Sequence, residues 1–313
     1  MKTKSKNKKL RIALGICIPL IIIIAAALAV VMKYGPTFGF YLVPPSAELY
    51  GKDALATIGK NGIYSRSDEW KSTYEECLKM IENAESYEDT YPAIKKALSV
   101  CGGKHSMFMT KSESQDTTES YDEVLPTVSL DGDIAIIKLP DFLVTAEDFL
   151  GTAEAGQKYA KVAEDFIHEN RDKIKGVVLD LRGNTGGDMG PMATAVSSLL
   201  PDGELVYYHY RSYDIPVTLK NGVVSNAGTG GRSLYPEEKL NVPVAILTDD
   251  MTASSGEALT LCFRGLENTR TFGAPTAGYT SVNMLYNMYD GAQMYLTVAF
   301  DKARTGEIFK ETP

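Results

Sequence analysis

The sequence predicts an α/β protein, because strands of the buried type alternate with amphipathic helices through its middle. Gly176–Leu181 is a continuous apolar run, typical of a strand covered on both faces in a parallel sheet. Val242–Leu247 is a second apolar run of strand length. Ala146–Asn170 instead carries its apolar residues at helical spacing. The 313 residues suffice for one large domain or two small ones.

The N-terminal residues differ from the rest in charge and hydropathy. Residues 1–11 form a basic head with six Lys and Arg, and residues 12–32 are uncharged and mostly aliphatic. At about 1.5 Å per residue, a helix over 12–32 spans roughly 31 Å, the thickness of one bilayer core. The basic flank predicts a cytoplasmic N-terminus and an extracytoplasmic remainder. We therefore predict a single-pass signal-anchor in the cell membrane. A cleaved signal peptide is the alternative, since Ala25–Ala29 offers small residues.

Two segments lead from the anchor to the main domain. Residues 33–62 contain several Pro and Gly residues and are predicted to be a stalk or linker. Residues 63–110 are predicted to form a small N-terminal helical subdomain. Its first helix is capped near Ser67, and its second spans 91–100 and ends at Gly102-Gly103.

The remainder divides into a loop and a core. Residues 111–127 are mostly polar and aperiodic, so we expect a flexible surface loop. Residues 128–313 are predicted to be the catalytic core, whose further elements are strands at 134–139, 205–210, 282–289, 294–300 and 307–310 and a helix ending at 200.

Charge and cysteine content exclude several function classes. The first 33 residues hold seven of the 32 Lys and Arg and no acid, so residues 34–313 carry 25 basic and 40 acidic side chains, a net charge of −15. An acidic domain argues against a nucleic acid partner. The cysteines show neither a disulfide framework nor metal-like spacing. We expect those beyond the anchor to be buried as small hydrophobic groups; the four are Cys17, Cys77, Cys101 and Cys262.

A serine pair lies where a strand is predicted to turn into a helix. Thr252–Glu257 follows the apolar run Val242–Leu247 and precedes another one. Ser254 would lie over a helix N-terminus, where unpaired N–H groups favour negative charge, as a nucleophile that forms an oxyanion requires. Ser254 and Glu257 also have the spacing of a capping box, so a purely structural role is the alternative.

A glycine-rich turn follows the other buried strand. Asp180–Gly187 reads Asp-Leu-Arg-Gly-Asn-Thr-Gly-Gly. Its N–H groups could form part of an anion-binding nest, although a tight strand-to-helix turn has the same composition. Neither the dinucleotide fingerprint nor the phosphate-loop pattern is present.

The chain has three histidines, of which His105 is the best candidate for a general base. His105 follows Gly102-Gly103-Lys104 in a predicted loop. His168 lies late in the amphipathic helix among acids and is predicted to be solvated. His209 lies among tyrosines in a predicted strand.

Three segments together resemble the core motifs of the S41 serine peptidases, the family of the C-terminal processing proteases and the tricorn core protease. They are Asp180–Gly187, Thr252–Glu257 and Gly273–Gly278, and the resemblance extends over roughly residues 65–313. It implies a ClpP/crotonase-like α/β core. The separation of His105 from the strand at 134–139 leaves no room for the PDZ domain of the processing proteases.

The resemblance implies roles for particular residues. Ser254, rather than Ser255, falls on the nucleophile. Processing proteases use a lysine as base, and Tyr279 stands at that position here, so the Ser–Lys dyad is absent. The tricorn-like branch uses a histidine instead, and Gly103–Ser106 fits its segment, which implies His105 as the base.

The same resemblance implies the supporting groups. Glu311 matches an acid near the C-terminus that would orient the imidazole, directly or through Ser106. The N–H groups of Ser255 and of Gly186 or Gly187 would hold the oxyanion. No metal or cofactor is implied.

The leading function is therefore a membrane-anchored, extracytoplasmic serine endopeptidase with a peptide or protein substrate and a Ser-His-(Glu) arrangement. One alternative is a non-catalytic peptide-binding or scaffold protein on the same fold, favoured by Tyr279 in place of lysine. Another is an acyl-CoA enzyme on a crotonase-like fold, which an exported location disfavours. Relatives often assemble, so a homo-oligomer is also open.

Overall fold

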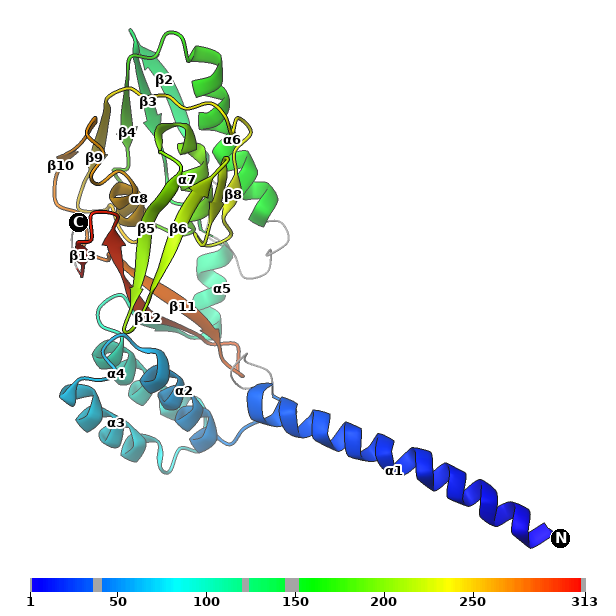
Figure 1. Ribbon diagram of the computed structural model, residues 1–313. Helices are drawn as coiled ribbons and strands as arrows, with labels where there is room; N and C mark the ends of the chain where they lie inside the picture. Colours follow the sequence, from blue (N-terminus) through cyan, green and yellow to red (C-terminus); the bar gives the residue numbers. More distant parts are fainter. Residues whose placement is uncertain (1, 36–40, 120–123, 144–151, 311–313) are drawn as a thin grey trace. The chain divides into compact units, whose positions relative to one another are not determined.

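The computed structural model describes residues 2–35, 41–119, 124–143 and 152–310 (Figure 1). The chain divides into two compact units. The helical unit comprises Met1–Cys101, Met107–Ser112 and Leu285–Tyr295. The core unit comprises Gly102–Ser106, Glu113–Met284 and Leu296–Pro313.

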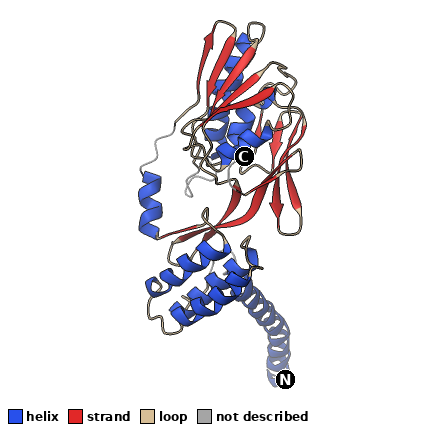
Figure 2. Ribbon diagram, turned by 90° about the vertical axis from the view of Figure 1, so that its left-hand side faces the viewer, coloured by secondary structure: helices blue, strands red, loops and turns tan. Residues whose placement is uncertain are grey.

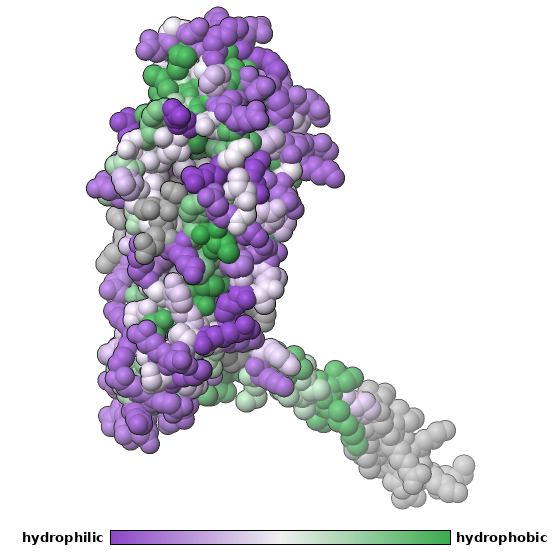
Figure 3. Space-filling view, turned by 60° about the vertical axis from the view of Figure 1, so that its left-hand side comes forward, coloured by the Kyte–Doolittle hydropathy of each residue, from purple (hydrophilic) through white to green (hydrophobic). Residues whose placement is uncertain are grey.

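The helical unit begins with α1, Lys2–Tyr34, which contains the predicted anchor. Its stretch Cys17–Tyr34 is long and apolar enough to cross a membrane and is not buried within the protein. Figure 3 shows hydrophobic residues exposed along this stretch. Ile21 and Ile23 are each 63% exposed. Such a surface is costly in water and favourable in a bilayer. A signal sequence shares these features.

Three further helices and one 3₁₀ turn complete the helical bundle. They are α2 (Ala47–Asn61), α3 (Asp68–Ile81), η2 (Glu88–Thr90) and α4 (Tyr91–Cys101). The predicted cap of α3 is confirmed, since Ser67 Oγ accepts a hydrogen bond from the Trp70 N–H at 3.1 Å. Cys77 and Cys101 are buried free thiols, as expected.

The predicted linker at 33–62 is wrong over its second half, which forms α2. The glycines there suggested an irregular chain, yet the apolar residues recur at helical spacing and face inward. Tyr50, Leu55 and Ile58 are fully buried. Tertiary burial therefore outweighs the low helix propensity of glycine.

The predicted loop at 111–127 is likewise wrong over its first residues, because α5 spans Lys111–Glu119. Lys, Glu and Gln are good helix formers even without an apolar face, so polarity alone was a poor guide. The short strand β1 (Met107–Met109) precedes α5 and pairs with residues 293–295 of β12.

The core unit contains a five-stranded sheet in the order β10-β9-β4-β3-β2. Its strands are β2 (Thr127–Asp131), β3 (Ile134–Lys138), β4 (Gly176–Asp180), β9 (Val244–Thr248) and β10 (Thr269–Gly273). All run parallel except β2. Because β4 and β9 are parallel neighbours, the glycine-rich turn after β4 and the serine turn after β9 lie at the same edge of the sheet.

The second sheet is antiparallel, with the core order β12-β5-β6-β7-β8, and β11 and β13 also pair with β12. Its strands are β5 (Gly203–Tyr210), β6 (Asp214–Lys220), β7 (Val223–Ser225), β8 (Gly231–Arg232), β11 (Ser281–Asn287), β12 (Gln293–Ala303) and β13 (Ile308–Phe309). The strands β6, β7 and β8 were not predicted, since β7 and β8 are short and Pro216 interrupts the pattern of β6.

Helices of the core unit lie between the strands of the two sheets (Figure 2). They are α6 (Thr152–Asn170), α7 (Met189–Ala195), η3 (Ser197–Leu199) and α8 (Ser255–Cys262). Every residue of α7 is buried, as is every residue of α8 after Ser255. One apolar cluster joins these helices to both sheets. The predicted α/β class is confirmed, and the partly buried first residue of α8 leads into a fully buried helix.

Candidate active site

Ser254 has a backbone conformation that serine rarely adopts. Its φ is 51° and its ψ is −116°, immediately before the first residue of α8. Such a conformation costs a non-glycine residue about 1–3 kcal/mol and is common at functional sites. The neighbouring Ala253 N–H donates to the carbonyl of Asn184 at 2.9 Å, which ties the serine turn to the glycine-rich turn.

Glu257 holds this turn in place. Ser254 and Glu257 form a capping box at the start of α8. In it, the Ser254 N–H donates a hydrogen bond to Glu257 Oε2 at 2.8 Å. The same oxygen accepts from the Tyr279 N–H at 2.7 Å. Oε1 accepts from Thr276 Oγ1 at 2.5 Å and from the Gly278 N–H at 2.8 Å. One buried carboxylate therefore joins the serine turn to residues 276–279.

A second buried carboxyl group, Asp301, lies near Glu257. It is 1% exposed, and its Oδ1 has no hydrogen-bond partner in the described part of the chain. Burial and the charge of Glu257 raise the pKa of Asp301 to about 8. Burial also raises the pKa of Glu257, but its four donors oppose that rise. Near neutral pH we therefore assign the negative charge to Glu257 and the proton to Asp301.

The Asp301→Asn variant should gain stability relative to the wild type as pH rises. An aspartate in the unfolded chain titrates near pH 3.9, so between about pH 4 and pH 8 the folded state retains a proton that the unfolded state has lost. Wild-type stability therefore falls across this range, and the variant lacks that loss. Urea unfolding should show the advantage of the variant growing by up to about 4 kcal/mol between pH 5 and pH 8. Parallel pH curves would contradict the assignment.

The two candidate oxyanion donors of the glycine-rich turn, the N–H groups of Gly186 and Gly187, differ in their hydrogen bonding. The Gly186 N–H donates to Asn184 Oδ1 at 2.9 Å and is thus occupied. No hydrogen bond within the described residues uses the N–H of Gly187 or that of Ser255. Ser255 Oγ donates to the Gly187 carbonyl at 2.5 Å, which holds the two residues together. A β-carbon built on Gly186 would lie 2.8 Å from Ser254 Cβ, so this backbone passes directly against the serine.

His105 lies in the turn after α4, and residues at the start of β11 hold it in place. Its Nδ1 lies 2.8 Å from Ser281 Oγ, and its carbonyl accepts from Asn283 Nδ2 at 2.8 Å. The imidazole packs against the Tyr279 ring with centroids 5.1 Å apart. Burial, together with the positive charge of Lys104, lowers the pKa of His105 to about 4. The imidazole is therefore neutral at pH 7, as a base must be.

Of the two predicted supporting residues, Ser106 makes its hydrogen bonds away from the imidazole. The hydrogen bonds of Ser106 Oγ are with Thr297, from Oγ to Thr297 Oγ1 at 3.1 Å and from the Thr297 N–H at 2.8 Å. Ser106 therefore anchors the loop that carries His105 rather than the imidazole itself. Glu311 lies outside the described residues.

Ser254 and His105 are both connected to residues 276–281. Glu257 binds the Tyr279 N–H and the Ser254 N–H with one oxygen, and the Tyr279 ring packs on His105. In the described ranges no hydrogen bond joins His105 to Ser254. Catalytic hydrogen bonds are often long before substrate binds, so this absence does not exclude His105 as the base of Ser254.

Tyr279 stands at the lysine position of the processing proteases, and its ring contacts a lysine from another segment, Lys104. Lys104 Nζ lies 4.9 Å from the Tyr279 ring centroid and donates to the Ala277 carbonyl at 3.5 Å. A cation over an aromatic face is a favourable contact. Lys104 therefore places positive charge beside His105.

The other histidines belong to surface ion pairs. His168 is 44% exposed in its side chain and pairs with Glu238, and His209 Nδ1 lies 2.6 Å from Asp214. Among the described residues, no cluster of His, Cys, Asp and Glu could hold a metal ion. Of the three histidines, His105 is therefore the one whose contacts lead to the serine turn, and it stays the candidate base.

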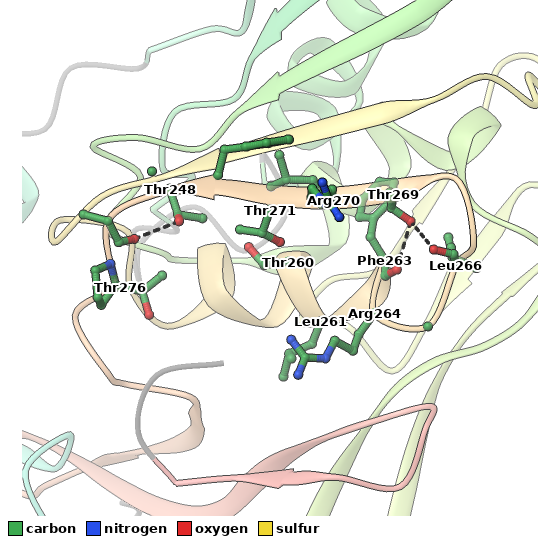
Figure 4. A pocket seen from close by; sticks show the side chains of 16 residues that line it. Thr248, Thr260, Leu261, Phe263, Arg264, Leu266, Thr269, Arg270, Thr271 and Thr276 are labelled. Carbon is green, nitrogen blue, oxygen red and sulfur yellow. Dashed lines mark hydrogen bonds between the residues drawn. The ribbon is translucent and has the colours of Figure 1, made fainter.

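A pocket of about 520 Å³ lies beside this region, between α8 and β10 (Figure 4). Its lining includes Thr260, Arg264, Arg270 and Phe272 but neither Ser254 nor His105. It reaches the site through Thr276, whose hydroxyl is bound by Glu257. The pocket is thus separate from the candidate catalytic residues.

Two residues of the site were not predicted from the sequence. Asn184 is 1% exposed, and its Nδ2 donates to the carbonyls of Leu139 and Pro140, each at 3.0 Å. Ser281 contacts the imidazole three residues after the Gly273–Gly278 segment. Its distance from His105 along the chain leaves no local signal of this contact.

The chain is similar to several known proteins in sequence and fold. Residues 133–311 match Peptidase family S41. The nisin-resistance protein of Lactococcus lactis subsp. lactis is 35% identical over 97% of this chain and 93% of its own length. A lipoprotein from Streptococcus agalactiae superimposes with a TM-score of 0.73 at 29% identity, covering 88% of this chain and 92% of that one.

A photosystem II D1 C-terminal processing protease shares the fold, with a TM-score of 0.56 at 15% identity over 86% of this chain and 92% of that one. The predicted S41 fold and family are thus confirmed, and with them a peptidase class of enzyme and a peptide or protein substrate. The chain belongs to peptidase family S41.

Proposed function

We propose that this chain is a serine endopeptidase anchored in the cell membrane by α1, with its core unit outside the cytoplasm. Ser254 is the nucleophile and His105 the general base. The observation that carries this proposal is the strained Ser254 at the start of α8, beside two N–H groups that no described residue uses. Strain and unpaired donors both cost stability, so a role in chemistry accounts for them together.

The reaction follows from this geometry. Ser254 Oγ attacks the peptide carbonyl carbon while His105 Nε2 takes its proton, and the carbonyl electron pair moves onto oxygen. The N–H groups of Ser255 and Gly187 bind that oxyanion. Gly186 is less suited because Asn184 already accepts its hydrogen bond. When the C–N bond breaks, His105 returns the proton to the amine, and water then releases the acyl group by the same steps. Glu311, which lies outside the described residues, stays a prediction from the sequence.

The substrate we propose is an antimicrobial peptide of the kind named by the nisin-resistance relative. That relative matches almost the whole chain, so the helical unit as well as the core unit is shared. Residues 34–313 carry a net charge of −15, which favours positively charged peptides. Outside the membrane, such a peptide would meet the site before it damages the cell.

A fluorophosphonate probe should label the wild-type protein at Ser254, as mapped by peptide mass spectrometry, because only an activated serine reacts. The Ser254→Ala variant should not be labelled, and Ser255→Ala is the neighbouring-serine control that keeps the nucleophile. Incubation with nisin should give peptide fragments with the wild type only. Equal labelling of Ser254→Ala would overturn the nucleophile.

The alternative is a non-catalytic peptide-binding protein on the same fold. The lack of a hydrogen bond between His105 and Ser254 in the described residues favours it. In that case the wild-type protein binds nisin, measured by calorimetry, but neither cleaves it nor reacts with the probe.

A further inference from the structure

We propose that Ser281 is a positioning residue for His105, occupying the place on Nδ1 that a carboxylate takes in a serine–histidine–acid triad. The inference rests on the proposed function, because it assigns the group behind the proposed base. Ser281 Oγ is 2.8 Å from His105 Nδ1.

The contact fixes which nitrogen can act as base. With the Nδ1 proton donated to Ser281 Oγ, the lone pair of the neutral ring lies on Nε2, the nitrogen that must accept the proton of Ser254. The Tyr279 ring packs against the imidazole at 5.1 Å, and Asn283 holds the carbonyl of His105. Ring tautomer, ring plane and backbone are thus each set by a different residue.

Ser281 is itself well anchored. Ser281 is 9% exposed and is the first residue of β11. Its N–H donates to the Tyr279 carbonyl at 2.7 Å. The Tyr279 N–H is bound by Glu257 Oε2, the oxygen that also accepts the Ser254 N–H. Ser254 and Ser281 are therefore both connected to Glu257 Oε2. Ser254 binds this oxygen directly, and Ser281 is connected to it through Tyr279.

A hydroxyl supports the imidazole differently from a carboxylate. It can fix the tautomer, but it brings no negative charge to stabilise the imidazolium that forms during reaction. Among the described residues, Ser281 and Tyr279 contact the ring, Asn283 binds the His105 carbonyl, and Lys104 adds a positive charge nearby. With a cation and neutral groups around it, the base should remain unprotonated well below pH 6.

The test is the pH dependence of peptide hydrolysis for the wild type and the Ser281→Ala, Ser281→Thr and Ser281→Asp variants. For the wild type, kcat/KM should decline only as pH falls through about 4, where protonation removes the base. Ser281→Ala should lower kcat about 10- to 100-fold with little change in KM. Ser281→Thr keeps the hydroxyl and should restore most of the rate. Ser281→Asp should move the acid limb up by about 2 pH units.

Histidine ¹⁵N chemical shifts give a readout that a merely structural role would not move. The wild type should carry the His105 proton on Nδ1, and Ser281→Ala should show a mixture of tautomers. Ser233→Ala, which alters a buried serine of another loop, is the matched control, and thermal unfolding checks that each variant is folded.

The outcomes separate the two proposals. If the wild type labels at Ser254 but Ser281→Ala and Ser281→Asp keep its rate, tautomer and acid limb, the positioning role is wrong and the peptidase stands. If the wild type neither labels nor hydrolyses peptide, the proposed function fails first.

Discussion

Replacing His105 by alanine is expected to lower kcat/KM for peptide hydrolysis by on the order of 10⁵-fold, with a small effect on stability. Removing the base of a serine–histidine pair typically costs about as much as removing the nucleophile, since the serine proton then has no acceptor. The binding contacts and the N–H groups of Ser255 and Gly187 remain, so KM should change little. Steady-state kinetics with a fluorogenic peptide measures both constants.

His168→Ala is the matched control for this variant. His168 is half exposed and pairs with Glu238 on the surface, so its loss should leave the kinetics unchanged. A His105→Ala variant that keeps more than a tenth of wild-type activity would show that another group accepts the serine proton.

The second large effect is expected for Glu257→Gln. The amide has nearly the shape of the carboxylate, but one acceptor oxygen becomes a donor that faces two other donors. Each buried donor left unpaired costs about 1–3 kcal/mol, so the free energy of unfolding should fall by about 3 kcal/mol. Activity should fall as well, by about 100-fold or more, because Ser254 and Tyr279 lose their common anchor. Urea unfolding and kinetics on the same preparations separate the two losses.

Glu267→Gln provides the control, since Glu267 is exposed in the turn before β10. Its effect should stay within about 0.5 kcal/mol. If Glu257→Gln is as stable and active as this control, the carboxylate is not what fixes the serine turn.

Much of the fold could be predicted because its strongest signals are local. The buried strands at Gly176 and Val242 and the capped helix after Ser67 depend on patterns within a few residues. The missed elements depend on distant partners. The helix α2 is stabilised by its packing, and the short strands β7 and β8 depend on pairing, β7 with β6 and β8 with β7.

The site divides in the same way. Ser254, His105 and Gly187 lie in segments that indicate turns and that resemble S41 motifs, and the resemblance implied their catalytic roles. The group behind the imidazole could not, because Ser281 is 176 residues away from His105. The choice between Gly186 and Gly187 needed the position of the Asn184 side chain.

The conformation of Ser254 also bears on how this chain can evolve. Glycine tolerates a φ of 51° without strain, so a Ser254→Gly substitution would relieve the turn while removing the nucleophile. Folding alone therefore favours the loss of this serine, and only selection for chemistry retains it. Homologues that no longer need the activity should therefore tend to replace this serine by glycine and gain stability. The residue at position 254 would then distinguish active from inactive members.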